Sequence, residues 1–175
     1  MKSQVKVIKE LRTKIKLLRA KKEYYKQSAS HDYLTKLYNR KSFNRFLRKE
    51  ILRSQRYNRI FSLLFIDVNK FKRYNDEKGH IAGDRLLKKI ASTLKNDIRG
   101  TNFIARWGGD EFAIILPETN KKRAEILVER LKELPITIGI ATYIEDGKTY
   151  KTILRKADKN LYKKKRGLDD ERKKR

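Results

Sequence analysis

Hydrophobic and polar residues follow two different periods along this chain, and the changes between them predict an order of helices and strands. Residues 61–66 are a short, nearly continuous apolar run of branched and aromatic side chains, which is typical of a buried strand. Residues 86–94 instead place leucine and isoleucine three and four positions apart, as one face of a helix requires. After residue 31 this pattern predicts strands at residues 60–67, 102–107, 111–116 and 136–142 and helices at residues 40–55, 81–98, 120–133 and 150–165. Helices interleaved with an antiparallel hairpin indicate an α+β fold in which helices pack against one sheet.

The first thirty residues carry the pattern of a coiled-coil helix. Apolar residues recur there at spacings of three and four: Ile8, Leu11, Ile15 and Leu18. Tyr25 lies one heptad beyond the last of these, and Lys22 interrupts the seam at an a position. We predict a helix that pairs in parallel with a second copy, although the seam is short and its lysines repel one another. The alternative is a helix that packs its apolar stripe on its own domain.

Composition bounds the class of protein. The chain has 175 residues, enough for one domain and an extension. It has no cysteine, which excludes disulfides and thiolate metal sites. No apolar run approaches the roughly 20 residues that span a bilayer, and the first residues are charged rather than a signal core. We therefore expect a cytoplasmic protein without a transmembrane segment.

The charge is strongly positive, with 47 Lys and Arg against 21 Asp and Glu and a formal net charge of +26. Such a charge attracts polyanions, including nucleic acid and acidic lipid. No basic motif interleaved with aromatic residues is present, so a dedicated nucleic-acid module is not indicated. Nonspecific polyanion binding is the expectation, with a lysine-rich surface as the simpler alternative.

One motif joins two glycines to two carboxylates. Gly108 and Gly109 are followed directly by Asp110 and Glu111, with apolar segments on both sides. Two glycines permit a tight turn, which predicts a β-hairpin with both acids at or just past its tip. A divalent cation such as Mg²⁺ would offset the repulsion between the acids, because it prefers hard oxygen ligands. A solvated acidic turn remains the alternative for this motif by itself.

A second acidic position favours the metal site. Asp67 stands at the end of the strand predicted at residues 60–67, where a carboxylate can leave the core and reach a cleft. The segment that follows, residues 68–83, is rich in side chains that contact phosphates and bases. An acidic strand end beside an acidic hairpin is the layout of a nucleotidyl-transfer palm, in which metal ions bridge a triphosphate and activate an attacking oxygen.

At this point the chain resembles the GGDEF domain, the catalytic module of bacterial diguanylate cyclases, which condense two GTP into the signalling molecule cyclic di-GMP. Five separated blocks carry the resemblance in order: Asp32-Tyr33-Leu34-Thr35 with Leu37-Tyr38-Asn39-Arg40, Asp67-Val68-Asn69-Lys70-Phe71-Lys72 with Asn75-Asp76, Gly79-His80 with Gly83-Asp84, residues 106–112, and Ala157-Asp158 with Leu161-Tyr162. The resemblance implies a palm-like fold of the ferredoxin or nucleotidyl-cyclase type, an antiparallel-rich sheet flanked by helices. The expected divisions are residues 1–30 as a basic dimerisation stalk, residues 31–167 as the catalytic domain and residues 168–175 as a charged tail.

The resemblance also implies a metal centre. Asp67 and Asp110 match the family's metal-binding carboxylates, and the backbone carbonyl of Val68 would add a ligand. Glu111 matches the acid implicated in metal binding and in activation of the 3′-hydroxyl. The implied cofactor is Mg²⁺ or Mn²⁺, with two ions in each active site, and the reaction implies a homodimer whose catalytic domains meet face to face.

Substrate residues follow from the same resemblance. Asn75 and Asp84 match the pair that reads guanine, and a carboxylate accepts hydrogen bonds that guanine donates and adenine does not. Lys72 and Lys165 match phosphate-binding lysines. The resemblance also implies that Phe71 contributes to substrate binding. The alternatives are helix capping for Asp84 and an ordinary surface lysine for Lys165.

The sequence departs from the family at a site where many members bind their product and are inhibited by it. The usual Arg-x-x-Asp appears here as Arg99 and Asn102, which replaces the carboxylate by an amide. An amide accepts less strongly than a carboxylate from guanine donors, so we predict weak or absent product inhibition. Asn69 also replaces an aspartate beside the metal acids, and we expect this change to be tolerated.

Three functions are compatible with these residues. The first is an active diguanylate cyclase. The second is a catalytically weak module that binds GTP or cyclic di-GMP as a signalling or interaction domain, although such domains typically lose their acids. The third is a basic nucleic-acid-binding protein on a palm-like fold.

Overall fold

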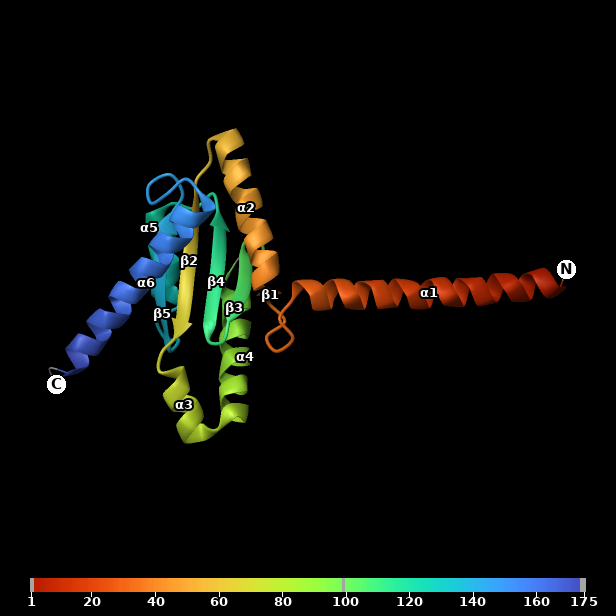
Figure 1. Ribbon diagram of the computed structural model, residues 1–175, viewed down its shortest axis with the longest axis horizontal. Coiled ribbons are helices and arrows are strands. Elements are labelled where there is room, and N and C mark those ends of the chain that lie inside the picture. The colour runs from red at the N-terminus through yellow and green to blue at the C-terminus, as the bar shows by residue number, and fades with distance from the viewer. Residues whose placement is uncertain (1, 99, 174–175) are drawn as a thin grey trace.

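The computed structural model describes residues 2–98 and 100–173, and its central feature is one five-stranded sheet with helices on both faces (Figure 1). The strand order is β1-β3-β4-β2-β5. The elements in chain order are α1 (Lys2–Ser30), β1 (Tyr38–Asn39), α2 (Arg40–Tyr57), β2 (Phe61–Val68), α3 (Phe71–Lys78), α4 (His80–Asp97), β3 (Phe103–Gly108), β4 (Glu111–Pro117), α5 (Lys121–Arg130), β5 (Ile136–Thr142) and α6 (Tyr150–Lys173). The α+β sandwich expected from the sequence is confirmed.

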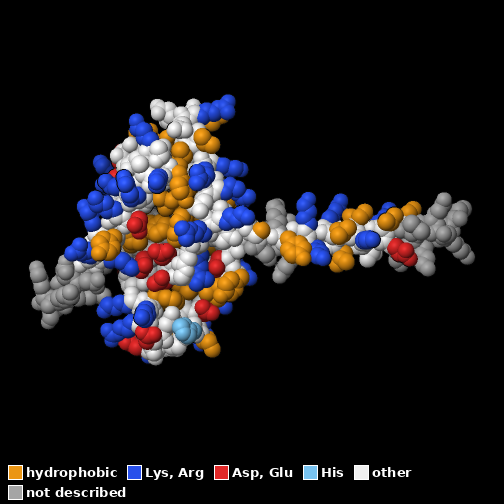
Figure 2. Space-filling view, viewed as in Figure 1, with side chains coloured by type: hydrophobic (Ala, Val, Ile, Leu, Met, Phe, Trp, Pro, Cys, Tyr) orange, Lys and Arg blue, Asp and Glu red, His pale blue; other side chains and the backbone are white. Residues whose placement is uncertain are grey.

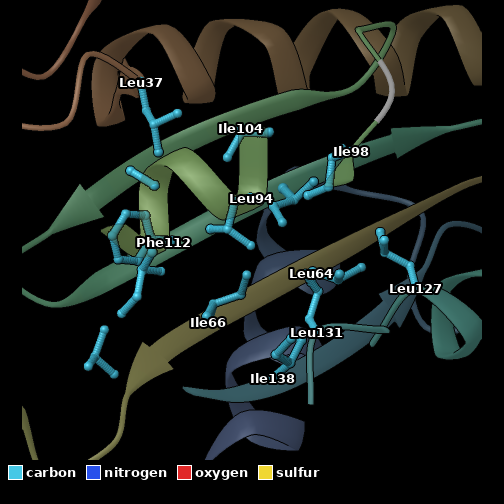
Figure 3. Close-up of a cluster of buried hydrophobic side chains, with 14 of the residues drawn as sticks. Leu37, Leu64, Ile66, Leu94, Ile98, Ile104, Phe112, Leu127, Leu131 and Ile138 are labelled. Atoms are coloured by element: carbon cyan, nitrogen blue, oxygen red, sulfur yellow. The ribbon is translucent and has the colours of Figure 1, made fainter. Parts of the chain in front are cut away.

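Strand β2 lies inside the sheet, antiparallel to both β4 and β5, and all eight of its residues are buried. Successive side chains of a strand point to opposite faces, so β2 contributes side chains to two separate hydrophobic cores. Leu64 and Ile66 pack in the core beneath α4 and α5, part of which is drawn in Figure 3. Leu63 and Phe65 pack in the other core, beneath α2 and α6. Asp67 continues this second series and therefore faces α6.

The contact between β5 and α6 is unusually close at Gly139. A Cβ atom on this residue would lie 2.2 Å from the carbonyl oxygen of Ala157 and 2.3 Å from the backbone nitrogen of Leu161. Only a glycine lets the helix backbone approach the strand this far. The position of α6 over the sheet, and of every side chain further along it, therefore depends on this residue.

Most sequence-predicted elements appear within a few residues of their expected bounds, one helix extends further, and two elements of the structure were not predicted. The helix expected at residues 150–165 continues to Lys173. Helix α3 was not predicted, because it holds no buried residue and so shows no apolar period. Strand β1 was not predicted either, because its two residues, paired in parallel with Ala105 and Arg106 of β3, are too short for a pattern.

Helix α1 projects away from the sheet and its helices (Figure 1). The side chains of its apolar seam are about half exposed: Ile8 49%, Leu11 54%, Ile15 49% and Leu18 56%. The alternative that this helix packs its stripe on its own domain is therefore wrong. Within residues 2–98 and 100–173, none of the helices combines the length and the apolar character needed to cross a bilayer.

Candidate active site

The acidic site forms where β2 ends and β4 begins. Asp67 of β2 lies directly opposite Glu111 of β4 in the antiparallel register. Directly opposed residues of two antiparallel strands point to the same face of the sheet, so both carboxylates face α6. Acidic side chains gather in this part of the surface in Figure 2, surrounded by Lys and Arg. Pairing of the strands thus brings together two acids that lie far apart in the sequence.

The turn between β3 and β4 holds Asp110 beside them. Gly109 takes a left-handed φ of 52°, while Gly108 pairs with Glu111 at a register shift that follows Arg106. The backbone nitrogen of Val68 donates to the carbonyl oxygen of Asp110 at 3.2 Å. This bond fixes the turn to the end of β2, and the antiparallel pairing of β3 with β4 confirms the predicted hairpin.

Arg106 holds the turn from the other side, a role that the sequence motif did not reveal. Its Nε and Nη2 donate to the carbonyl oxygen of Gly109 at 2.9 Å and 2.7 Å. Its Nη1 pairs with Oδ1 of Asp32 at 3.2 Å, and both side chains are largely buried. Burial alone would raise the pKa of Asp32, but hydrogen bonds from Thr35 and the charge of Arg106 hold that pKa below its usual value. The segment after α1 is thereby tied to the acidic turn.

Lys165 of α6 reaches the acidic site. Its Nζ lies 2.5 Å from Oδ1 of Asp67, and the Asp67 side chain is 12% exposed. This oxygen is buried and has no further hydrogen-bond partner among the described residues. The ammonium group therefore supplies the positive charge that a buried carboxylate needs in the absence of another cation.

Burial and nearby acids raise the pKa of Asp67 and of Glu111. Burial is the main cause that raises the pKa of Asp67, Lys165 opposes the shift, and the charge of Asp110 adds to it. Burial likewise raises the pKa of Glu111, followed by the charges of Asp67, Asp110 and Asp158, with Lys165 opposing. A site that destabilises its own carboxylates in this way favours binding of a cation.

These residues suit a divalent metal by their chemistry. The donors are hard carboxylate oxygens, and one of them is buried with only a lysine for a partner. In the described part of the chain, no three acidic or histidine side chains are already close enough to form a ready-made metal site. Binding of an ion would thus require Lys165 to withdraw and the acids of the turn to converge.

A second group of sequence-predicted site residues lies between α3 and α4. Gly83 of α4 faces α3 so closely that a Cβ atom would lie 1.9 Å from Oδ1 of Asn75 and 3.1 Å from Cζ of Phe71. The Asn75 oxygen is buried and accepts no hydrogen bond in the described structure. Asp84 follows Gly83 and is exposed, as is Lys72 of α3. The missing side chain of Gly83 makes room for a polar group with unused hydrogen-bonding capacity.

The expected product site lies at the opposite end of the sheet. Asn102 lines a groove of about 750 Å³ together with the end of β4, Glu118 in the loop that follows it, and Arg130 of α5. Nη2 of Arg130 donates to the carbonyl oxygen of Asp97 at 3.2 Å. Arg99 lies outside the described residues.

The sequence matches the family described as "Diguanylate cyclase, GGDEF domain" over residues 29–170. The chain belongs to the GGDEF family. It is 35% identical over 162 residues to the diguanylate cyclase DgcP of Pseudomonas aeruginosa, with 85% of this chain and 24% of DgcP covered. It is 29% identical over 180 residues to the diguanylate cyclase DosC of Escherichia coli, with 91% of this chain and 39% of DosC covered. The chain thus spans less than half the length of these two relatives.

Solved GGDEF structures share its architecture. The coiled coil and GGDEF domain of DgcB from Caulobacter crescentus, solved in complex with c-di-GMP, matches with a TM-score of 0.84 at 25% identity, over 91% of this chain and 93% of that one. The diguanylate cyclase SiaD of Pseudomonas aeruginosa, solved with its activator SiaC, matches with a TM-score of 0.77 at 30% identity, over 93% and 68% of the two chains. The likeness to DgcB extends over an N-terminal helix as well as the GGDEF domain.

Asn69 has a structural explanation within the GGDEF domain. Its Oδ1 accepts a hydrogen bond of 2.6 Å from Oγ1 of Thr137 on β5, and its backbone nitrogen donates to the carbonyl oxygen of Pro135 at 2.8 Å. The side chain is therefore engaged with β5 rather than free to bind a cation. That the replacement of an aspartate by Asn69 is tolerated stays a prediction.

Proposed function

We propose that this chain is a diguanylate cyclase that condenses two GTP into cyclic di-GMP. The observation that carries the proposal is the pair Asp67 and Glu111, opposed on one face of the sheet with Asp110 in the adjoining turn. Family members that only bind nucleotides typically lose these acids, and this chain has kept all three. In the proposed reaction, the 3′-hydroxyl of each GTP attacks the α-phosphate of the other and pyrophosphate leaves.

Asp67, Asp110 and Glu111, with the backbone carbonyl of Val68, would hold two Mg²⁺ or Mn²⁺ ions. Such ions, when bound, neutralise the triphosphate and lower the pKa of a coordinated hydroxyl. The ion pair of Lys165 with Asp67 supports a role for this lysine at the site, where it would bind a phosphate oxygen once Asp67 has a metal for a partner. Lys72 would contact the triphosphate from α3.

Asn75 and Asp84 would select guanine. The buried oxygen of Asn75 is an unused acceptor, and Asp84 is an exposed carboxylate that follows the close contact at Gly83. Guanine offers an N1–H and an exocyclic amine to such acceptors, and adenine would leave them unpaired. The substrate expected from these groups is GTP.

Gly83→Ala is expected to raise the KM for GTP by about tenfold, a loss of roughly 1.4 kcal/mol in binding. The new methyl group collides with the end of the Asn75 side chain, which can rotate away, so the fold itself loses little stability. Steady-state kinetics and thermal unfolding of the variant measure both effects. In an Asn75→Ala background the same substitution should change KM much less, and an undiminished effect there would contradict this explanation.

Two GTP-loaded domains must meet for the reaction, so we propose a homodimer with catalytic domains face to face. The apolar seam of α1 would bring the two chains together. A pair of heptads is short for a stable coiled coil, so association through α1 alone should be weak.

Asn102→Asp is expected to make the enzyme at least about tenfold more sensitive to cyclic di-GMP, because a carboxylate accepts more strongly from guanine than an amide does. Initial rates with added product measure the inhibition constant. Thr101→Asp, which adds the same charge to the same groove, is the matched control and should leave that constant unchanged. Equal inhibition of the wild type and Asn102→Asp would contradict the assignment of weak product inhibition to this residue.

The test of the function is incubation of the purified chain with GTP and Mg²⁺, followed by chromatography of the products. Cyclic di-GMP from the wild type but not from an Asp110→Ala, Glu111→Ala variant is the expected result. Intact GTP at protein concentrations high enough for dimerisation would overturn the proposal and favour a module that only binds nucleotide.

A further inference from the structure

Helix α1 carries an apolar seam with basic residues on both of its edges. With Ile8 and Ile15 at a positions and Leu11 and Leu18 at d positions, the residues that flank the seam are fixed by the heptad. The two flanking residues between Ile8 and Leu18 and the next two beyond Leu18 are all basic: Arg12 and Arg19 at e, Lys14 and Lys21 at g. All four side chains are exposed. Figure 2 shows apolar and basic side chains side by side along this helix.

These edges oppose pairing with a second copy. In a parallel pair, a g residue faces the e residue of the next heptad in the partner helix, which places Lys14 beside a second Arg19. In an antiparallel pair, g faces g and e faces e, which is again like against like. The e and g residues of a coiled coil influence its choice of partner, so these basic edges weaken the pairing of α1 with a second copy.

No helix in the described part of the chain offers the opposite charge. Each of α1 to α6 contains more Lys and Arg than Asp and Glu. Within the described residues, none of the helices therefore complements the charge of α1.

We propose that an acidic, helix-forming segment of a partner protein binds along α1, with apolar residues on the seam and carboxylates against Arg12, Lys14, Arg19 and Lys21. The narrow a/d stripe favours a helix as the occupant, because a helix that lies on a lipid surface needs a wider apolar face. Since the partner's carboxylates neutralise the edges, two α1 helices in such a bundle no longer repel one another. This links partner binding to the proposed face-to-face pairing of the catalytic domains.

The experiment uses the full chain and a synthetic acidic peptide of about four heptads, with leucine at a and d and glutamate at e and g. Fluorescence anisotropy of the labelled peptide at low ionic strength measures its affinity. The test variant reverses the four edge charges, Arg12→Glu, Lys14→Glu, Arg19→Glu and Lys21→Glu. The matched control reverses four exposed lysines on α4 and α5, Lys89→Glu, Lys95→Glu, Lys121→Glu and Lys122→Glu, and so changes net charge equally.

The wild type and the control variant are expected to bind the acidic peptide at least about tenfold more tightly than the test variant. A peptide with lysine at e and g should show the reverse preference. Equal affinity of the test and control variants for the acidic peptide would reduce the interaction to net charge and overturn the proposal. Tighter binding of α1 to anionic vesicles or duplex DNA than to the peptide would also overturn it, because a different class of partner would then fit better.

Sedimentation velocity supplies a readout that does not depend on catalysis. The wild type alone is expected to associate weakly at low salt and more strongly with the acidic peptide present. Tight self-association at low salt that the four edge reversals leave unchanged would show that the edges do not control pairing and would contradict the proposal.

Discussion

Asp67→Asn is expected to lower the rate of cyclic di-GMP formation by about a thousandfold or more, since the proposed chemistry needs a charged oxygen at the end of β2. Asparagine keeps the shape of the side chain and removes its charge. The opposing Glu111 and the Lys165 ammonium remain in place, so the loss measures the carboxylate itself. Initial rates with GTP and Mg²⁺ test this. The control is Asn69→Ala, which changes the residue directly after β2 and leaves the acids in place, and it should retain most activity.

The same variant should be as stable as the wild type, or more stable, without metal at neutral pH. The folded-state pKa of Asp67 is raised, chiefly by burial, so the folded protein binds more protons than the unfolded chain between the usual pKa of 3.8 and the raised value. Stability of the wild type therefore falls as pH rises through that window, and the charged carboxylate is a net cost above it. The amide introduced by Asp67→Asn does not titrate, so the variant should have a flatter profile there.

Metal ions should reverse this order. At a Mg²⁺ concentration about 100-fold above its dissociation constant, binding stabilises the folded state by about 2.7 kcal/mol, and the variant should gain much less. Chemical unfolding between pH 4 and 7, about the range of carboxyl titration, measures both effects with and without Mg²⁺. If Asp67→Asn instead lost more than about 2 kcal/mol at neutral pH without metal, the carboxylate would be a structural residue and its catalytic assignment would be in doubt.

Sequence reasoning found the parts of this protein that have a period or a motif. Strand β2 has a continuous apolar run because both faces of the sheet are covered, and the hairpin was recognisable from Gly108 and Gly109. Helix α3 was not predicted because none of its residues is buried, and its sequence therefore shows no apolar period. Tertiary burial, rather than helix propensity, creates the pattern that such reasoning detects.

The site shows the same limit. The acids could be named from their motifs, but only strand register shows that Asp67 and Glu111 lie opposite each other. The support that Arg106 gives to the turn depends on a carbonyl oxygen at Gly109, and backbone acceptors carry no residue signature. The ion pair of Lys165 with Asp67 depends on where α6 crosses the sheet. Contacts to backbone atoms and between distant elements are invisible to local patterns.

The close crossing of α6 over β5 at Gly139 predicts the second large effect. Gly139→Ala is expected to destabilise the protein by about 2 kcal/mol or more, and Gly139→Val by more still. Local propensity points the other way, because replacing a glycine inside a strand normally favours folding by about 0.5–1 kcal/mol. The clash decides the sign. The atoms within 2.2–2.8 Å of the new Cβ belong to the backbone of Ala157 and Leu161, which cannot rotate aside as a side-chain end can.

Helix α6 must therefore shift as a unit, and Lys165 lies one turn beyond Leu161. The substitution should weaken both the fold and the ion pair with Asp67, so activity should fall together with the free energy of unfolding. Gly167→Ala in the same helix is the matched control, since its Cβ would meet no atom within 4 Å, and it should be neutral or stabilising by up to about 1 kcal/mol. Urea unfolding of the two alanine variants provides the comparison. Equal stability of Gly139→Ala and the wild type would mean that α6 can lift from β5 at no cost, and the placement of Lys165 would then need another explanation.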